Sequence, residues 1–428
     1  MPKKLFLISI DSMVTEDIGI MSKLPNFVRI IKDSSMLKNV ITTYPSLTHS
    51  VHTSIMTGCN PGTHGVINNE LLQPENEAPH WFDYADQCKA ETIWEVFRKN
   101  GKTCALVFYP VTVGADVEWN IHRPGVGGPH KEYKDAEAEM VATSTPGIYT
   151  GKLYERCHPS FCLQHYYDWD DFACKACAQL IDDHEPDLVM THITVIDAIR
   201  HSDGVFSKKL TEAYEFLDPL FGEIWEVFDR KNLWDDYIIC FTADHGHLDI
   251  NKVAFPNVLF KQLGYIRTNE DGSLKDWDIF CHGSGCCMPV YAKTPEFADK
   301  AREILNENRE KFGIGEILEK DYLEEHYGLK GDFAFFAETD GGTAFRTDWN
   351  GNSVELPGAG DYRSSRATHG HMPEKGVKPM MFFRSPDSVG NRVIVQQGYI
   401  IDEAPTLARL CGYDMPNADG KPIKEFLL

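Results

Sequence analysis

The sequence predicts a doubly wound α/β fold, in which helices cover both faces of a mostly parallel sheet. Three observations support this prediction: apolar runs with the length of buried strands, amphipathic stretches of helical length between them, and polar residues directly after several runs. Strands buried on both faces are near-continuous apolar runs, and their alternation with helices is typical of a parallel sheet. The 428 residues exceed the usual size of one core, so we also expect a smaller second unit.

Strand and helix patterns alternate through the first 246 residues. The expected strands are 5–10, 103–108, 187–193 and 236–242, and the expected helices are 48–57, 91–100, 170–183 and 208–228. Residues 114–169 are rich in Gly, Pro, His and Tyr, which predicts a long irregular excursion beside the site.

After Gly246 the alternation ends, which predicts an inserted unit. It would contain a charged helix at 298–311, an acidic and aromatic stretch at 319–330, and hairpins with Gly and Asn turns at 332–354. The sheet pattern returns at 380–383 and 392–395, and a last helix is expected at 403–411. We therefore expect a metal-binding catalytic core of residues 1–255 and 355–428, and a smaller α+β cap of residues 256–354.

Charge and composition limit the partners of the chain. A net charge of -22 argues against binding of nucleic-acid polymers or acidic membranes. No apolar stretch approaches the ~18 residues of a membrane span, and the N-terminal apolar run is too short for a signal peptide. The twelve cysteines form no compact framework, so we expect reduced thiols and a cytoplasmic protein. The oligomeric state has no indication in the sequence.

The stretch from Thr43 to Asn69 contains a hydroxyl at the predicted start of a helix. Tyr44-Pro45-Ser46 is expected to be extended, because the residue before a proline avoids the helical region. Thr48 would then begin a helix that ends at Gly58. Unpaired backbone N–H groups at a helix N-terminus suit an oxyanion or a phosphate. The alternative interpretation is that Thr48 is only a helix cap.

Acidic and imidazole groups follow several apolar runs. The candidate groups are Asp11, the pair Asp197 and His201, the pair Asp244 and His245, and His369 with His371. In a doubly wound sheet, ligands bind at the carboxyl ends of the strands. Each segment alone also fits a solvated helix face or a turn, but together they predict a two-metal hydrolytic site. Carboxylate and imidazole ligands without thiolates suit zinc, with manganese or iron as alternatives.

The charges of this predicted site suit a phosphoryl group. Two divalent cations and the carboxylates of Asp11, Asp197 and Asp244 leave one net positive charge. A cation also lowers the pKa of a hydroxyl that it binds, which makes a threonine nucleophilic near neutral pH.

These segments in combination resemble the type I phosphodiesterase/nucleotide pyrophosphatase family of the alkaline phosphatase superfamily. The matching stretches are ISID at 8–11, YPSLT at 44–48, TG at 57–58, HGVINN at 64–69, ADHG at 243–246, THG at 368–370 and the tail at 400–423. The resemblance implies an alkaline-phosphatase-like fold and a metal-dependent phosphoric ester hydrolase.

The resemblance also implies roles for individual residues. One metal would be held by Asp197, His201 and His369, and the other by Asp11, Thr48, Asp244 and His245. Thr48 would attack phosphorus and form a covalent phosphothreonine, while Asn69 would bind a phosphoryl oxygen. The expected cofactors are two divalent ions, with zinc preferred, and the expected substrate is a small phosphate ester or pyrophosphate.

The sequence also departs from the family. His49-Ser50-Val51 follows the threonine, where the family usually has Phe-Pro-Asn, so nucleotide selectivity stays open. A phosphonoacetate hydrolase-like C–P hydrolase, a phosphomonoesterase and a pseudoenzyme that binds metal or nucleotide remain alternatives. Cys59-Asn60-Pro61-Gly62-Thr63 lacks the arginine of a sulfatase motif and is interpreted as a turn. The candidate substrate contacts are His52, Trp81, Tyr84 and Arg123, for which packing roles are the alternative.

Overall fold

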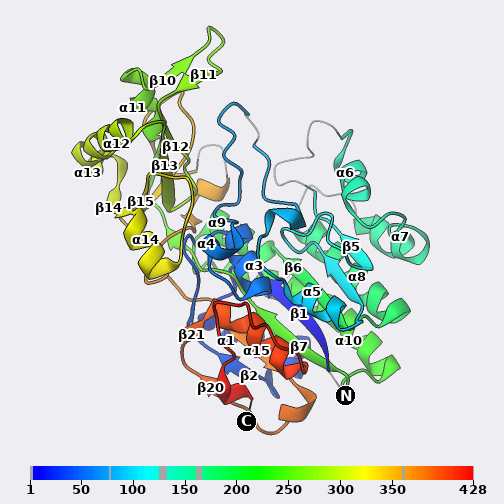
Figure 1. Ribbon diagram of the computed structural model, residues 1–428. Coiled ribbons are helices and arrows are strands. Elements are labelled where there is room, and N and C mark those ends of the chain that lie inside the picture. Colours follow the sequence, from blue (N-terminus) through cyan, green and yellow to red (C-terminus); the bar gives the residue numbers. More distant parts are fainter. Residues whose placement is uncertain (1–2, 77–78, 125–132, 161–165, 359–361, 428) are drawn as a thin grey trace.

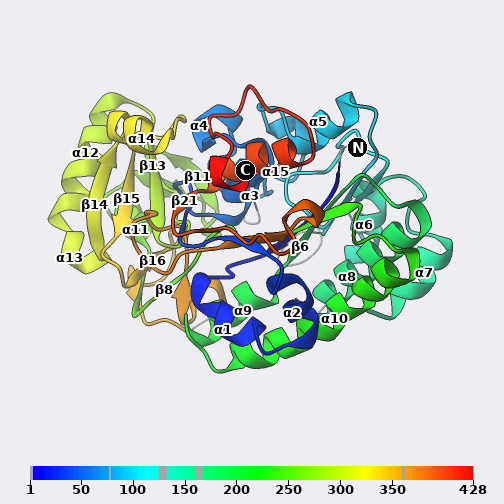
Figure 2. The same ribbon diagram turned by 90° about the horizontal axis from the view of Figure 1, so that it is seen from below.

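An eight-stranded sheet lies between two layers of helices (Figures 1 and 2). The computed structural model describes residues 3–76, 79–124, 133–160, 166–358 and 362–427. The strand order is β20 (Ile394–Val395), β2 (Ser35–Leu37), β19 (Met381–Arg384), β7 (Tyr237–Thr242), β1 (Lys4–Ile10), β6 (Leu188–Ile193), β4 (Cys104–Val107) and β5 (Trp119–Ile121). Strand β19 is antiparallel to both of its neighbours, and the other pairs are parallel. The predicted doubly wound, mostly parallel sheet is confirmed.

The two faces of the sheet are covered by different helices, as Figure 2 shows. One face carries α1 (Ile18–Met21), α2 (Pro25–Ile31), α8 (Tyr166–His184), α9 (Val195–Asp203) and α10 (Lys209–Lys231), and the other carries α3 (Thr48–Thr57), α5 (Ile93–Lys99) and α15 (Glu403–Leu410). Phe6 and Ile8 of β1 pack into the first layer, and Leu5 and Leu7 pack into the second. Since successive side chains point to opposite faces, burial on both sides explains the continuous apolar run.

The helix boundaries follow from local capping. Thr92 begins α5 with a capping box, in which its hydroxyl accepts from the backbone N–H of Glu95 and the Glu95 carboxylate accepts from the N–H of Thr92. Gly58 ends α3 at a φ of 68°. Such features are local in sequence and can be recognised without the tertiary structure. All five predicted helices are present within a few residues of their predicted ends: 48–57, 91–100, 170–183, 208–228 and 403–411.

The prediction of an irregular excursion at 114–169 is wrong in part. Residues 119–121 pair with β4 as strand β5, and helices α6 (Ala136–Thr143) and α7 (Gly151–Cys157) precede a 3-10 turn, η3 (His158–Ser160). The Asp135 carboxylate caps α6 by accepting from the N–H of Ala138. Composition rich in Gly and Pro concealed these short elements. Residues 125–132 and 161–165 of the predicted excursion lie outside the described residues.

A four-stranded antiparallel sheet with its own helices lies beside the main sheet (Figure 1). It consists of β12 (Ile279–Cys281), β13 (Cys287–Ala292), β15 (Phe335–Thr339) and β14 (Ile314–Glu319), with α11 (Pro256–Gln262), α12 (Pro295–Glu307), α13 (Arg309–Phe312), α14 (Lys320–Tyr327) and the hairpin of β10 (Ile266–Thr268) and β11 (Leu274–Trp277). Phe260, Phe280 and Phe335 belong to a separate hydrophobic cluster. The domain boundaries at residues 255 and 355 stay a prediction.

The prediction of hairpins within residues 332–354 is wrong. Strand β15 pairs with β13 and β14, whereas β16 (Thr343–Phe345) and β17 (Val354–Glu355) both pair with β9 (Lys252–Ala254). Turn residues show where a strand ends but do not select the partner of the next strand.

Short elements complete the chain. They are η1 (Thr15–Asp17), β3 (Val40–Ile41), α4 (Pro61–His64), η2 (Ala85–Gln87), β8 (Leu248–Asp249), η4 (Tyr362–Ser364), β18 (Ala367–Thr368), η5 (Pro386–Ser388), β21 (Gly398–Tyr399), η6 (Ile400–Asp402) and η7 (Lys424–Phe426). Among the helices of the described residues, none has both the length and the apolar character that a bilayer crossing requires.

Candidate active site

Three adjacent central strands end at the same edge of the main sheet. In the parallel register, Ile10 of β1 lies opposite Ile193 of β6, and Ser9 lies opposite Thr242 of β7. Asp11 directly follows β1, and Asp244 follows β7 by two residues. Helix α9, which carries Asp197, begins two residues after β6. The topology therefore brings the three predicted carboxylates together.

Asp11, Asp244 and His245 form one group of potential ligands, which we name the Asp244 cluster. Nε2 of His245 lies 3.1 Å from Oδ2 of Asp244 and 3.6 Å from Oδ1 of Asp11. The Asp244 carboxylate is oriented by two backbone N–H groups, from Ser12 at 3.1 Å and His245 at 3.0 Å, which both donate to Oδ1. The other oxygen of this carboxylate, Oδ2, is therefore directed toward Nε2 of His245.

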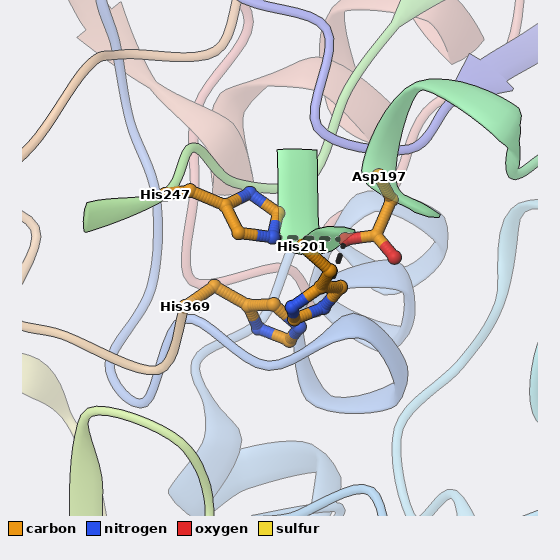
Figure 3. A group of neighbouring side chains, drawn as sticks. All are labelled: Asp197, His201, His247 and His369. Atoms are coloured by element: carbon orange, nitrogen blue, oxygen red, sulfur yellow. Dashed lines mark ion pairs between the residues drawn. The ribbon is translucent and has the colours of Figure 1, made fainter. Parts of the chain in front are cut away.

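Asp197, His201, His247 and His369 form a second group, the Asp197 cluster, which is shown in Figure 3. The i, i+4 spacing on α9 places His201 Nε2 3.4 Å from Oδ1 of Asp197, as predicted for two side chains on one helix face. Nε2 of His247 lies 3.3 Å from the same oxygen. His369 follows β18 and completes the group from a distant part of the chain.

The imidazoles of the Asp197 cluster are held through their Nδ1 atoms. Nδ1 of His201 lies 2.9 Å from the carbonyl oxygen of Ala367, and Nδ1 of His369 lies 3.0 Å from that of Ser46. A carbonyl oxygen only accepts, so both Nδ1 atoms donate a proton to it, which leaves Nε2 of each ring as the atom that a cation could bind. This arrangement of outer hydrogen bonds is typical of metal-binding histidines.

Burial, and repulsion between groups of the same charge, shift the pKa values of the carboxyl groups and imidazoles at the site. Loss of solvent, followed by repulsion from Asp197 and Asp244, raises the pKa of Asp11 well above its ordinary value. Burial and Asp197 also raise the pKa of Asp244. Burial and neighbouring imidazoles hold the pKa values of His245, His247 and His369 well below the ordinary value, so these rings are neutral.

The donor atoms of both clusters fit divalent cations. Several of them are buried without a hydrogen-bond partner within the described residues: Asp11 Oδ1, Asp197 Oδ1, Asp244 Oδ2 and His247 Nε2. Buried polar atoms without partners are costly, and a cation would offset both this cost and the mutual repulsion of the carboxylates. Carboxylate and imidazole donors with no thiolate suit zinc.

Thr48 is the first residue of α3 and lies beside the Asp244 cluster. Its Oγ1 is 3.3 Å from Nε2 of His245. The next backbone N–H, that of His49, donates to Oδ1 of Asn69 at 2.8 Å. Since the Asn69 oxygen accepts this bond, its Nδ2 donor is directed elsewhere. The structure thus brings Thr48 and Asn69 together at the helix N-terminus.

Two cavities adjoin the clusters. The larger, of about 640 Å³, is lined by Asn69, His201 and His369 and extends to His282 of the smaller sheet region. The smaller, of about 80 Å³, is lined by residues that include Thr48, Asn69, His201 and Arg123. Trp81 lines both. Two of the four predicted substrate contacts, Trp81 and Arg123, therefore lie where a substrate could reach them.

Neither of the other two predicted substrate contacts lines these two cavities: His52 needs correction, whereas the contact of Tyr84 stays a prediction. His52 is fully buried behind Thr48: its Nδ1 donates to the Thr48 carbonyl oxygen at 2.7 Å, and its Nε2 lies 2.8 Å from Ser9 Oγ. Burial lowers its pKa to about 3, so the ring is neutral. Tyr84 is 48% exposed on the surface. His52 lies one helical turn after Thr48, which suggested that its side chain faces the site. Strand β1, which carries Ser9, packs against this side chain instead.

Sequence reasoning missed two histidines at the site. His247 lies in the Asp197 cluster, and Nε2 of His192 lies 3.0 Å from Oδ2 of Asp11. Both had a detectable pattern. His247 is two residues after His245, and His192 is an imidazole near the carboxyl end of a mostly apolar strand. The described cysteines are free thiols.

Comparisons with known proteins agree with this architecture. A family model described as type I phosphodiesterase / nucleotide pyrophosphatase matches residues 5–369. An uncharacterized pyrophosphatase/phosphodiesterase of Schizosaccharomyces pombe is 24% identical over 52% of this chain and 40% of its own length. Human ectonucleotide pyrophosphatase/phosphodiesterase family member 1 is 25% identical over 52% of this chain and 21% of its own length. The chain thus spans less than half the length of these relatives.

Solved structures show the same fold. Murine ectonucleotide pyrophosphatase / phosphodiesterase 5 superposes with a TM-score of 0.66 at 14% identity, covering 98% of both chains. Its inactive threonine-to-alanine variant in complex with AMP superposes with a TM-score of 0.66 at 15% identity, over 98% of this chain and 97% of that one. The predicted alkaline-phosphatase-like fold is confirmed. From the family match over residues 5–369, the chain belongs to the type I phosphodiesterase / nucleotide pyrophosphatase family.

Proposed function

We propose that this chain is a phosphodiesterase/nucleotide pyrophosphatase that uses two divalent cations and Thr48 as its nucleophile. One observation carries the proposal: two buried clusters of carboxylates and imidazoles lie beside a single hydroxyl at a helix N-terminus. Asp197, His201 and His369 would hold one cation, and Asp11, Asp244, His245 and Thr48 would hold the other. The donor set favours zinc.

Thr48 is placed to attack a phosphoryl group. Its Oγ loses its proton to solvent and forms a bond to phosphorus, the bond from phosphorus to the leaving oxygen breaks, that oxygen takes up a proton from solvent, and a phosphothreonine results. Water then attacks phosphorus and frees Thr48. When bound, a divalent cation supplies positive charge that lowers the pKa of the hydroxyl and neutralises phosphoryl oxygens. The Asn69 Nδ2 group donates to a phosphoryl oxygen, since its Oδ1 is engaged by the His49 N–H.

Nucleotide-like substrates are supported by two findings. The family is described as nucleotide pyrophosphatases, and a solved structure of the same fold is in complex with AMP. The two cavities extend from the Asp197 cluster in two directions, so both ester substituents of a diester have space. Trp81 lines both cavities and offers an aromatic surface to a base. A cytoplasmic location is part of this proposal, supported by the free thiols among the described cysteines.

The test compares Thr48→Ala with the wild-type chain on bis-p-nitrophenyl phosphate, p-nitrophenyl phosphate and phosphonoacetate. Thr48→Ala should lose at least about 10³-fold in kcat, because no nucleophile remains, while metal analysis still finds cations. Thr53→Ala is the matched control, since this threonine of the same helix is buried and its hydroxyl donates to the His49 carbonyl oxygen, at 2.7 Å.

Each outcome of this comparison separates one alternative. Preferred turnover of the monoester or of phosphonoacetate would overturn the diester assignment. Metal binding with no turnover of any of the three substrates would indicate a pseudoenzyme. Full activity of Thr48→Ala would remove the proposed nucleophile.

A further inference from the structure

His247 lies in the Asp197 cluster, although the proposed function gives that cation only Asp197, His201 and His369 as ligands. We infer that His247 is a fourth protein ligand, so that one carboxylate and three imidazoles enclose this cation. The inference rests on the proposed function, because it requires a cation at this cluster, and it assigns the two metal sites different coordination.

The separations of the donor atoms match a tetrahedral site. Ligand bonds of about 2.0–2.2 Å from zinc to nitrogen or oxygen imply separations of about 3.3–3.6 Å between ligands. His247 Nε2 and His201 Nε2 lie 3.3 Å and 3.4 Å from the same oxygen of Asp197. All four donor atoms lie within 4.8 Å of one another, and Figure 3 shows the three rings gathered on one side of the Asp197 carboxylate.

A direct hydrogen bond between His247 and Asp197 does not account for their contact. Nε2 of His247 and Oδ1 of Asp197 are both buried, and neither has a hydrogen-bond partner among the described residues. A well-aligned N–H···O bond would satisfy both atoms at once. The two atoms approach to 3.3 Å without forming a hydrogen bond, and both lie near the imidazoles of His201 and His369. This arrangement fits two ligands of one cation.

The backbone fixes His247 opposite His369. Strands β8 and β18 pair antiparallel, with Leu248 opposite Thr368. His247 directly precedes Leu248 and His369 directly follows Thr368, so the ladder places the two histidines at adjoining positions. Their ring centroids are 5.1 Å apart, and the His201 and His247 centroids are 4.5 Å apart.

Ser12 fixes the orientation of the His247 ring. Its hydroxyl lies 2.7 Å from Nδ1 of His247, and when Nδ1 donates to this oxygen, Nε2 keeps its lone pair for a cation. Ser12 has a φ of 62°, which is uncommon for a residue with a side chain. The Arg200 guanidinium holds this conformation by donating from Nε to the Ser12 carbonyl oxygen at 3.0 Å.

The additional imidazole would give the two sites different kinds of ligand. Zinc in proteins is held by thiolate, imidazole and carboxylate groups, which bind it more strongly than a neutral hydroxyl does. The Asp197 cluster would offer one carboxylate and three imidazoles, whereas the Asp244 cluster would offer two carboxylates, one imidazole and the Thr48 hydroxyl, which is the group that meets the substrate. In the substrate-free protein, the cation of the Asp197 cluster should therefore exchange more slowly than its neighbour.

A crystal structure of the zinc-loaded wild-type protein, with anomalous data at the zinc edge, tests the inference without any variant. The expected result is a zinc peak about 2.0–2.2 Å from His247 Nε2 and from the other three donor atoms. Zinc bound to Asp197, His201 and His369 with His247 Nε2 more than about 3 Å away would overturn the inference and leave the proposed function intact. No zinc at either cluster would overturn both.

Competition of the metal-free protein with a chromophoric zinc chelator provides the second readout. His247→Gln should weaken one of the two zinc sites by at least about tenfold. His371→Gln is the matched control, because this histidine is equally buried and has its Nδ1 2.9 Å from a backbone carbonyl oxygen, that of Met372, but lies outside both clusters. Equal zinc affinities of His247→Gln and wild type, with circular dichroism showing both folded, would overturn the inference.

Discussion

Arg200 is a fully buried cation, and its partners decide the geometry around the site. Its guanidinium lies 2.6 Å from Asp17 Oδ2, and it also donates to the carbonyl oxygens of Ser12 and Val205. Tyr214 donates to the same Asp17 oxygen at 2.9 Å. A buried charge is tolerated only with such partners, so Arg200 joins helix α9 to the loop that carries Asp11.

Arg200→Met should destabilise the protein strongly, because the Asp17 carboxylate would stay buried without its cation. The expected loss in free energy of unfolding is about 3–5 kcal/mol, measured by urea denaturation. Arg29→Met is the control, since the Arg29–Asp229 pair has a similar contact, at 2.7 Å, but reaches solvent, and it should cost no more than about 1 kcal/mol. Equal losses in the two variants would contradict this account of Arg200.

Glu403 is a buried carboxyl group whose ionisation should appear in the pH dependence of stability. Its Oε2 accepts from Thr242 Oγ1 at 2.7 Å, and its Oε1 has no hydrogen-bond partner in the described part of the chain. Burial raises its pKa to about 8. The stability from this group is complete below its unfolded pKa and is lost as the pH rises through about 8, at about 1.4 kcal/mol for each pH unit between the two values.

Glu403→Gln should therefore flatten the stability profile. Because the amide cannot ionise, the variant should exceed the wild type in melting temperature at pH 9 and lose this advantage at pH 5. Thermal unfolding at a series of pH values measures the difference. If the wild type and the variant lose the same stability between pH 5 and pH 9, the ionisation of Glu403 does not destabilise the folded protein and the prediction is wrong.

At the scale of elements, the ends of α3 position the nucleophile. The helix begins with Thr48 at the sheet edge and ends at Gly58 with a left-handed residue. A Cβ at Gly58 would lie 2.9 Å from the side chains of Ala418 and Pro405. The absence of a side chain thus lets the chain near its C-terminus pack against the end of this helix.

Gly58→Ala and Gly101→Ala separate the cost of a left-handed backbone conformation from the cost of placing a Cβ where there is no space. Both residues have nearly equal φ values, 68° and 70°, but a Cβ at Gly101 would meet no atom within 4 Å. Both variants should lose about 1 kcal/mol from backbone strain, and Gly58→Ala should lose about 1–3 kcal/mol more from overpacking. Chemical denaturation measures both, and equal losses would mean that the contact with Ala418 relaxes freely.

At the scale of the whole molecule, the two clusters connect the ends of three sheet strands with helices α3 and α9 and the strand β18. Their members come from residues 11 to 369. Bound cations would cross-link these segments only in the folded chain, so metal binding stabilises the fold by mass action.

Removal of metal should therefore lower the melting temperature, and zinc should restore it more strongly at pH 8 than at pH 5.5. Raised carboxyl pKa values at Asp11 and Asp244 mean that protons compete with the cation near neutral pH. The lowered pKa values of His245 and His369 mean that these rings stay neutral over the same range. Scanning fluorimetry with chelator and with added zinc measures the shift. A zinc effect that is equal at both pH values would contradict carboxylate ligation.

The sequence by itself determined the central strands, the helix ends and the position of most predicted site residues. Apolar runs, capping residues and glycine stops act over a few neighbouring positions, and a residue after a parallel strand must lie at the ligand-binding edge. The amino-acid order alone therefore places Asp11, Asp197 and Asp244 at that edge.

Only the tertiary structure decided which side chains meet across the fold. Strand β15 took partners that its local turns did not indicate, and His52, which local spacing placed at the substrate, was buried by the neighbouring strand. His247 entered the Asp197 cluster because Ser12, 235 residues earlier, holds its ring. Such contacts depend on packing between segments far apart in the chain, and no local pattern encodes that packing.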